Sequence, residues 1–421
     1  MVRRPLFKKV ILQKPVNPSL FLKYLSAKKK KALLKQAAYL RGKRVVHVNA
    51  TELGGGVAEI LKSLIPYLRS LGIESDWYAI DPKIGGNFFA ITNKFHNALQ
   101  GAPIRITASE WAEYEKTSRL LAIELDKIDC DVLVINDPQP ILAGCYSHVN
   151  KHKIYFSHID TSAVHKPVWK KLFPAISSYH HIVFSNADFV NGELQRGKVK
   201  IFTPAIDPLA SKQKIVPKKN ARAYLKKHGG IPENFPLIAQ VSRFDVWKNP
   251  LGVIQAFRLV QSAYPEAKLA LVGFNEAKDN PAAGTVYKDT SAIAGKSNEI
   301  FLFFDPKGKD ISEFSVMTQN GADVVVQNST KEGFGLVVSE AMWKRQPVIG
   351  GPASGVRKQI QNGRNGFIVK TPEELAQKIE FLLSRPDKKK IMGERARKTV
   401  TDKFLFPRLV FDHIKLYRSC F

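Results

Sequence analysis

The chain has 421 residues, of which 44% are hydrophobic and 24% charged, and its formal net charge is +28. This length suffices for two domains of ordinary size, and no apolar run approaches the roughly 20 residues of a membrane-spanning helix. The basic N-terminus lacks the apolar stretch of a signal peptide. Three scattered cysteines predict neither a disulfide framework nor a zinc site, so we expect a cytoplasmic protein.

Half of the net charge lies in residues 1–44, which hold fourteen Lys or Arg and no Asp or Glu. Such a basic N-terminal extension attracts polyanions, so the partners it predicts are an anionic membrane surface, bound peripherally, or nucleic acid. A basic surface that only keeps the protein soluble explains the same composition, and no nucleic-acid-binding module is recognisable. Within the extension we expect a helix over residues 18–40.

The next part of the chain alternates between strands and helices. A strand is expected at residues 44–48, followed by Gly54, Gly55 and Gly56 and then a helix from about Val57 with leucines at helical spacing. A strand, a glycine turn and a helix N-terminus are the parts of an anion cradle, although three glycines also suit a simple tight turn. Further strands are expected at residues 76–80, 132–135, 154–156, 181–185 and 200–202, with helices within 85–104 and at 108–127.

Two of these strands end in ionisable residues, Asp137 and His158. Ligands of a doubly wound sheet bind at the carboxyl ends of its strands, so both residues are candidates for catalysis. A lone histidine at such a position more often has a structural role, and that alternative stays open for His158.

Residues 209–220 are rich in Lys and Pro and are interpreted as a linker, after which the alternation restarts. Strands are expected at residues 237–241, 269–272, 300–304, 324–326, 347–349 and 367–369, with a loop at 273–284. Helices are expected from Pro250, up to Asn320, from about Leu336, and over 372–384, 387–403 and 404–417. This order predicts an α/β protein with two doubly wound, Rossmann-like domains.

The second domain gathers charged residues at its strand ends. Arg243 and Lys248 follow the strand at 237–241, and they can hold a phosphate as a bidentate donor and a point charge. Glu332 and Glu340 follow the strand at 324–326 with seven residues between them. Surface ion pairing of the two cations, and a capped helix with solvated acids, are the alternatives. A ligand with a central diphosphate and hydroxyl-rich ends would satisfy all of these groups.

The acids enclose Gly333, Phe334, Gly335 and Leu336, and this spacing, together with Arg243 and Lys248, resembles the signature of the retaining glycosyltransferases of GT-B fold. More narrowly, the chain resembles the trehalose glycosyltransferring synthases over most of residues 44–418. The stretches that carry the narrower resemblance are 47–59, 94–97, 136–140, 158–160, 204–208 and 243–248. Departures from the family pattern include Val246, Lys331 and Arg345, and they leave the donor base open.

The resemblance implies a GT-B fold with an interdomain cleft, an acceptor domain of residues 45–212 completed by the helix at 406–421, and a donor domain of residues 213–405. It implies transfer of glucose from a nucleoside-diphosphate glucose (UDP-, ADP- or GDP-glucose) to glucose, forming trehalose. No cofactor is required beyond this donor substrate. No metal-ligand cluster is visible, so Mg²⁺ would assist only through the nucleotide.

Residue roles follow from the resemblance as well. Glu332, beside Gly333 to Leu336, would bind hydroxyls of the donor sugar, and Glu340 would hold the ribose. Arg243, Lys248 and the backbone N–H groups of residues 54–56 would bind the leaving diphosphate, stabilising its charge in the transition state.

On the acceptor side, the resemblance places His158 over the transferring sugar and Asp137 near the acceptor. Retention in this fold needs no covalent nucleophile, because the leaving phosphate itself accepts the proton of the acceptor. Three alternatives remain: a retaining disaccharide phosphorylase, a transferase to a lipid or another sugar, and a non-enzymatic nucleotide- or polyanion-binding protein. The oligomeric state is also open, with a homodimer as one arrangement.

Overall fold

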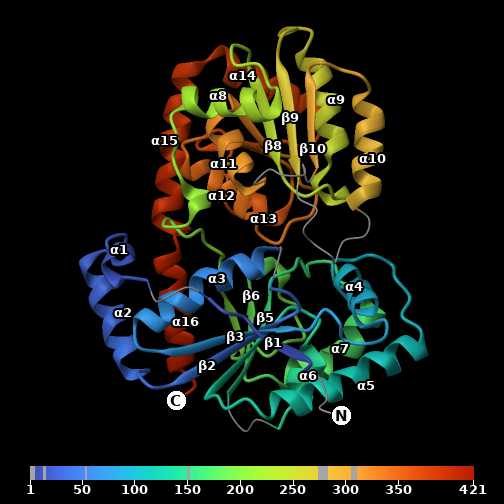
Figure 1. Ribbon diagram of the computed structural model, residues 1–421, viewed down its shortest axis with the longest axis vertical. Helices are drawn as coiled ribbons and strands as arrows, with labels where there is room; N and C mark the ends of the chain where they lie inside the picture. The colour runs from blue at the N-terminus through green and yellow to red at the C-terminus, as the bar shows by residue number, and fades with distance from the viewer. Residues whose placement is uncertain (1–4, 13–15, 53–54, 149–151, 274–282, 305–310) are drawn as a thin grey trace. The chain divides into compact units, whose positions relative to one another are not determined.

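The structure is a computed structural model that describes residues 5–12, 16–52, 55–148, 152–273, 283–304 and 311–421 (Figure 1). The chain divides into two compact units. Unit 1 comprises Met1–Pro204 and Phe406–Phe421, and unit 2 comprises Ala205–Leu405. Each unit contains one sheet flanked by helices. Among the described residues, no helix has the length and apolar character needed to cross a bilayer.

The sheet of unit 1 has seven strands in the order β1-β3-β2-β4-β5-β6-β7. β1 pairs antiparallel with β3, and the other pairs are parallel. The strands are β1 (Phe7–Lys9), β2 (Arg44–Asn49), β3 (Glu74–Ile80), β4 (Val132–Asn136), β5 (His152–Ser157), β6 (His181–Phe184) and β7 (Val199–Ile201). Because β2 and β4 are neighbours from which the chain leaves in opposite directions, the sheet has its topological switch point between them.

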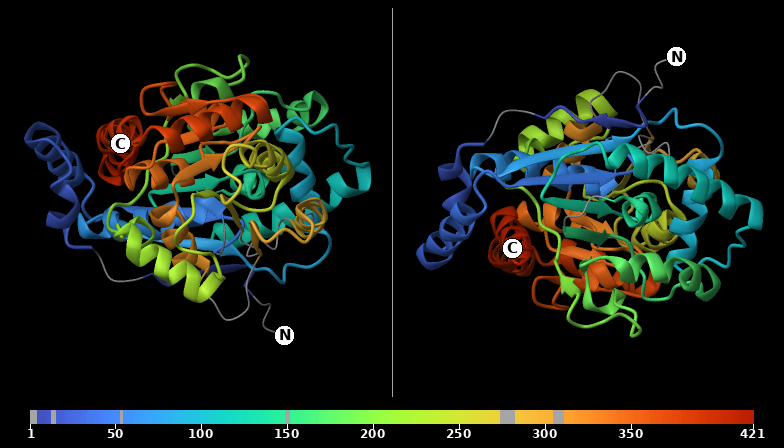
Figure 2. Two further views of the ribbon diagram at one scale, coloured as in Figure 1. Left: turned by 90° about the horizontal axis from the view of Figure 1, so that it is seen from above. Right: turned by 90° about the horizontal axis from the view of Figure 1, so that it is seen from below.

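Helices cover both faces of this sheet (Figures 1 and 2). One face packs against α4 (Phe88–Leu99), α5 (Ala108–Leu125), α6 (Ile141–Tyr146) and α7 (Lys166–Ser178). The other packs against α3 (Gly55–Ser70) and α16 (Phe406–Arg418), and α16 also contacts α2 (Ala27–Tyr39), which follows α1 (Pro18–Leu22). Since side chains alternate along a strand, Val46 and Val48 of β2 enter the first core while His47 points to α16.

The sheet of unit 2 has six parallel strands in the order β10-β9-β8-β11-β12-β13. They are β8 (Leu237–Val241), β9 (Lys268–Gly273), β10 (Ile300–Phe304), β11 (Val324–Gln327), β12 (Val348–Gly350) and β13 (Gly366–Ile368). The switch point lies between β8 and β11, so the loops that follow these two strands are neighbours at the carboxyl edge.

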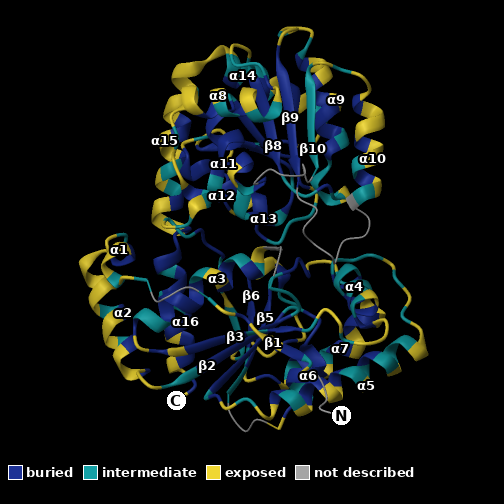
Figure 3. Ribbon diagram, in the orientation of Figure 1, coloured by how far each residue is buried: buried dark blue, intermediate teal, exposed yellow. Residues whose placement is uncertain are grey.

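The helices of unit 2 also form two layers. One layer holds α9 (Pro250–Val260), α10 (Ala283–Ala294) and α14 (Pro372–Ser384). Around the other face lie α8 (Lys218–Gly229), α11 (Ile311–Gly321), α12 (Leu336–Trp343), α13 (Ser354–Arg357) and α15 (Pro386–Lys403). The central strands β8 and β11 are buried along their whole length, and the outward faces of the helices are exposed (Figure 3). Such two-sided burial explains why these strands are continuous apolar runs.

Most expected strands and helices are present, with three corrections. The helix expected over 18–40 is wrong as a single element: α1 ends at Leu22, and Ser26 caps α2 with its hydroxyl 3.4 Å from the backbone nitrogen of Lys29. Residues 209–220, interpreted as a linker, contain a 3₁₀ turn at Ser211–Gln213 and the start of α8. Strand β1 was not anticipated. Most of the loop expected at 273–284 lies outside the described residues.

Candidate active site

The loops after β8 and β11 are tied together by hydrogen bonds through one buried amide. The side-chain oxygen of Gln240, on β8, accepts from the backbone N–H of Asn328 at 2.9 Å, and its amide nitrogen donates to the carbonyl of Lys248 at 3.0 Å. Thr330 adds a backbone bond to Trp247 at 2.8 Å. The two loops that carry the predicted donor residues therefore form one hydrogen-bonded assembly within unit 2.

Lys248 and Glu332 meet at this assembly. The Lys248 Nζ donates to Oε2 of Glu332, and the two side chains are only 11% and 16% exposed. Arg243 is more open, at 35% exposure, and its guanidinium lies 3.5 Å from Asp245. The carboxylate of Asp245 also caps the turn at Val246–Lys248, accepting from the N–H of Trp247 at 2.9 Å. The loops thus present a mostly buried ion pair, Lys248 with Glu332, and a more exposed guanidinium on Arg243.

The glycine loop after Glu332 packs closely against the backbone at Gly355. Gly335 has φ +81°, a left-handed conformation that side chains disfavour, and it precedes α12 without a side-chain cap. A Cβ on Gly355 would lie 2.5 Å from the Cα of Phe334, so only glycine fits there. Buried Gln359 donates to the carbonyls of Phe334 and Gly335 at 2.6 and 3.2 Å. The start of α12 is therefore held in a fixed position, and a helix N-terminus of this kind suits a polar or anionic ligand.

Glu340 lies on α12, one helical turn before its end, and is partly exposed. In the described part of the chain its carboxylate makes no hydrogen bond or ion pair. Lys344, next on the same side of the helix, is buried and donates to the backbone of Lys212 at 2.7 Å and to Gln319 at 3.0 Å. Burial lowers the pKa of Lys344 to about 8. Lys344 also donates to the backbone carbonyl of Glu340 at 3.3 Å, so its charge lies near the Glu340 carboxylate. Among the described residues it makes no hydrogen bond to the carboxylate oxygens, which are available to a ligand.

In unit 1, Asn136, Asp137 and His158 meet at the carboxyl ends of the neighbouring strands β4 and β5. The Asp137 carboxylate accepts from the backbone N–H of His158 at 2.9 Å, and its own N–H donates to the carbonyl of Phe156 at 2.8 Å. Asp137 has φ +61°. Such strained conformations persist only where the surroundings enforce them, and they cluster at functional sites. Asp137 therefore holds the end of β5 in place from the end of β4.

The protonation state of the His158 ring follows from its neighbours. The side-chain nitrogen of Asn136 donates to the carbonyl of Val48 at 3.1 Å, so its oxygen faces the Nε2 of His158, 3.1 Å away. Burial lowers the pKa of His158, against the opposing charge of Asp137. A neutral ring facing an acceptor carries its proton on Nε2. The Nδ1 atom is then left as an acceptor for a hydroxyl group.

The glycine turn after β2 is described only in part. Gly54 lies outside the described residues, and Gly55 and Gly56 are the first two residues of α3. The first four N–H groups of a helix have no partner within it. The predicted role of residues 54–56 as phosphate donors stays a prediction.

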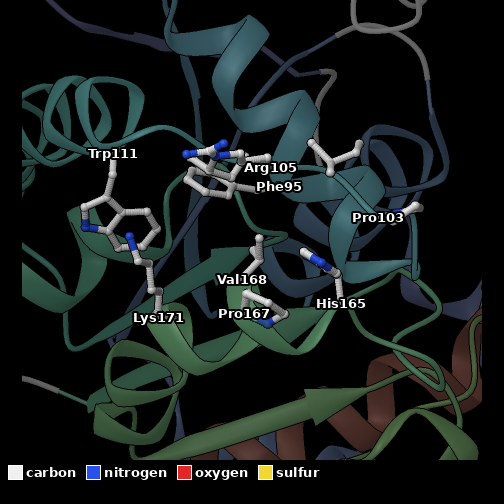
Figure 4. A pocket seen from close by; sticks show the side chains of 10 residues that line it. Phe95, Pro103, Arg105, Trp111, His165, Pro167, Val168 and Lys171 are labelled. Carbon is white, nitrogen blue, oxygen red and sulfur yellow. The ribbon is translucent and has the colours of Figure 1, made fainter.

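A separate pocket of about 240 Å³ opens in unit 1, among α4, α5 and α7 (Figure 4). Phe95 and Trp111 supply aromatic walls, and Arg105 and Lys171 supply positive charge. The Nζ of Lys171 lies 5.1 Å from the centre of the Trp111 ring. None of the predicted site residues lines this pocket.

The structure brings together Lys248 with Glu332, and Asp137 with His158, whereas no hydrogen bond or ion pair among the described residues joins Arg243 or Glu340 to these pairs. That all six residues serve one ligand stays a prediction. No group of His, Cys, Asp or Glu able to hold a metal occurs among the described residues. Asn136, Gln240 and Gln359 were not predicted from the sequence as positioning groups. The first two had a signal, a polar residue at or near the end of a buried apolar strand, but Gln359 had none.

Comparison with known proteins matches both parts of the chain. The family described as "trehalose synthase, N-terminal domain" matches residues 47–191, and "glycosyl transferases group 1" matches residues 222–399. A trehalose synthase from Rubrobacter xylanophilus is 38% identical over 389 residues, 90% of this chain and 91% of that protein.

Two solved structures share the fold at low sequence identity. A protein from Anabaena in complex with UDP-glucose has a TM-score of 0.64 and 16% identity, covering 90% of this chain and 100% of that one. An α,α-trehalose-phosphate synthase from Burkholderia xenovorans in complex with glucose-6-phosphate has a TM-score of 0.68 and 12% identity, with the same coverage. The expected GT-B fold is confirmed by such neighbours.

Proposed function

The chain belongs to the family of the trehalose synthases and is a glycosyltransferase of GT-B fold, and from this premise we propose that it transfers glucose from a nucleoside-diphosphate glucose to free glucose, forming trehalose. Its homologues support trehalose-related glycosyl transfer. The donor class is supported by the UDP-glucose held by the Anabaena protein, and a sugar acceptor by the glucose-6-phosphate held by the Burkholderia protein.

One observation carries the proposal for the donor: the Lys248–Glu332 pair at the switch point of unit 2. Before the donor binds, each charge neutralises the other. A diphosphate entering beside Arg243 would take over Lys248, and this would release the Glu332 carboxylate to the hydroxyls of the sugar. The exchange converts a resting ion pair into two separate contacts, one for each end of the scissile bond.

The proposed reaction breaks the bond between the anomeric carbon and the diphosphate oxygen. Arg243 and Lys248 would stabilise the negative charge that develops on the leaving group, and Glu332 would respond to the positive charge that develops on the sugar. The acceptor hydroxyl attacks from the same face, and its proton passes to an oxygen of the leaving diphosphate. The new bond therefore keeps the α configuration of the donor.

Unit 1 would serve the acceptor and the transferring sugar. His158, with its Nε2 proton engaged by Asn136, would accept a hydrogen bond from a sugar hydroxyl through Nδ1. In this assignment Asp137 acts mainly through the His158 backbone that it holds.

Product analysis tests the proposal. The protein is incubated with glucose and, separately, UDP-, ADP- or GDP-glucose, and the new anomeric proton is followed by NMR. We expect α,α-trehalose and release of the matching nucleoside diphosphate. A β linkage would contradict the retaining mechanism, and an absence of product with every donor would contradict the proposed donor class.

Two further incubations separate the alternatives. Trehalose with inorganic phosphate yields glucose 1-phosphate only if the protein is a phosphorylase. Maltose alone yields trehalose only if the protein rearranges a disaccharide without a nucleotide. We expect neither product at a rate comparable with the nucleotide-dependent reaction.

A further inference from the structure

Helix α16 places two polar aromatic residues beneath the carboxyl edge of the unit 1 sheet. His413 is 3% exposed and Tyr417 is fully buried. Burying such groups costs free energy unless hydrogen bonds replace the water they lose. No part of the proposed reaction uses them, so their position calls for an explanation.

Their polar atoms are joined through one hydroxyl group. The Tyr417 Oη lies 2.8 Å from the Nδ1 of His413 and 2.9 Å from the Nε2 of His47, on β2. Because a hydroxyl donates one hydrogen bond and accepts others, it can serve one imidazole as donor and the other as acceptor. The bridge therefore fixes α16 to β2 and also fixes the orientation of the His413 ring.

The His413 ring then forms the base of an aromatic stack. It lies parallel to Phe156, with centroids 5.0 Å apart and planes 8° apart. Phe156 also stacks with His158 at 5.6 Å and 18°. Phe202 closes the edge of the His413 ring at 5.3 Å. The order is thus His413, Phe156, His158, from the helix to the edge of the sheet.

Besides this stack, hydrogen bonds among the described residues hold His158 at only two atoms. Asp137 binds its backbone N–H, and Asn136 binds Nε2. These contacts still allow the ring to tilt about the line to Asn136. A flat surface beneath the ring restricts that tilt, but only if Phe156 is itself prevented from moving.

We propose that His413 and Tyr417 are positioning residues for His158, because they hold Phe156 beneath its ring and so fix where Nδ1 points. This inference rests on the proposed role of His158 in sugar transfer. A ring that tilts by a fraction of its width would misplace the acceptor atom, and small misplacements of reacting groups cost up to about 100-fold in rate.

A matched pair of substitutions tests the stack. His413→Phe and His413→Leu both fill the site and both lose the bond to Tyr417, but only phenylalanine can stack on Phe156. We expect His413→Phe, which keeps the stack but loses the bridge, to lower kcat less than about 10-fold, whereas His413→Leu lowers kcat about 10- to 100-fold with little change in donor KM. Equal kcat values in the two variants overturn the proposal. Lys415→Ala, on the exposed side of α16, is the control and should leave kcat unchanged.

Tyr417→Phe provides a second measurement if His413→Leu does not fold. It keeps every ring and removes only the bridging hydroxyl, so kcat should fall about as far as in His413→Phe, which loses the same bridge. In protein labelled with ¹⁵N-histidine, the His158 signals should broaden as the ring loses its fixed orientation. Unchanged kcat together with unchanged His158 signals overturns the proposal.

His158→Ala separates this inference from the proposed function. If His158→Ala turns over at the wild-type rate, the role of His158 fails and the inference fails with it. If His158→Ala is inactive while His413→Leu is fully active, only the inference fails. In the His158→Ala background, His413→Leu should cost nothing further, as a residue that acts through His158 requires.

Discussion

Acidification should destabilise unit 1 through His47. Its side chain has no exposed surface, Nε2 bonds to Tyr417, and Nδ1 is buried with no hydrogen-bond partner among the residues that the structure describes. Burial is the main cause that lowers the pKa of His47 from 6.5 to about 3, and the nearby His158 adds to it. When the pH falls below 6.5, the ordinary pKa of histidine, His47 binds a proton in the unfolded chain but not in the folded protein.

The size of the effect follows from these two values. The stability that His47 contributes is fully present above pH 6.5 and is lost as the pH falls toward 3. Linkage then gives a loss of about 2 kcal/mol between about pH 7 and about pH 5. The pKa of His413 is lowered in the same direction by burial, so it adds a loss of the same sign.

Hydrogen exchange measured on peptides from β2 and β4 reports the opening of unit 1 directly, without assuming that both units unfold together. Glutamine places its amide nitrogen near the position of histidine Nε2 and does not titrate, so His47→Gln should lose about 2 kcal/mol less than the wild type over this pH range. His148→Gln, at an exposed histidine, is the matched control. Equal losses in wild type and His47→Gln would refute the reasoning.

Three further predictions concern the charged groups. Replacing Arg243 and Lys248 together by alanine should lower turnover by several orders of magnitude, because one contact of this kind is commonly worth about 3–4 kcal/mol; near-normal steady-state turnover would mean that the diphosphate binds elsewhere. Glu332→Gln should depress kcat more than donor affinity, whereas Glu340→Gln should chiefly raise donor KM, and the reverse pattern in initial rates would exchange their roles. Replacing the exposed lysines 28–31 by glutamine should weaken sedimentation with anionic vesicles in a salt-dependent way. Deleting residues 1–44 is the poorer test, since it removes β1, α2 and the start of β2. If the wild type itself shows no salt-sensitive binding to vesicles or RNA, the basic extension has no polyanion partner of these kinds.

The sequence predicted where the strands end better than it predicted which side chains lie in contact at those ends. Apolar runs that stop at a polar residue locate Asp137 and Glu332, because parallel strands buried on both faces must be apolar up to the edge of the sheet. The ion pair of Lys248 with a residue 84 positions away depends on strand order, which local patterns do not determine. His47 and Tyr417 are 370 positions apart, and their contact follows only from the path of α16.

Three smaller features were mispredicted or missed from the sequence, each for its own reason. The Ser26 cap divides the expected N-terminal helix, since a serine side chain competes for the backbone N–H groups of the next turn. Three-residue β1 is too short for a periodic pattern and is stabilised by its pairing with β3. Gln359 is ordinary in sequence, and its hydrogen bonds to the glycine loop depend on the tertiary fold alone.

The division of unit 1 into two separate segments affects the order in which the two units can fold during synthesis. All of unit 2, residues 205–405, leaves the ribosome before α16 does. Domains generally fold as units during synthesis, with the N-terminal one first. Here unit 1 cannot complete its fold until α16 has been synthesised. Until then His47 and Phe156 lack the side chains that cover them. We expect nascent chains arrested before residue 406 to be cleaved by protease within residues 44–204 and to resist it within unit 2. In a nascent chain of this kind the Lys248–Glu332 pair of unit 2 could form before α16 is present to stack on Phe156.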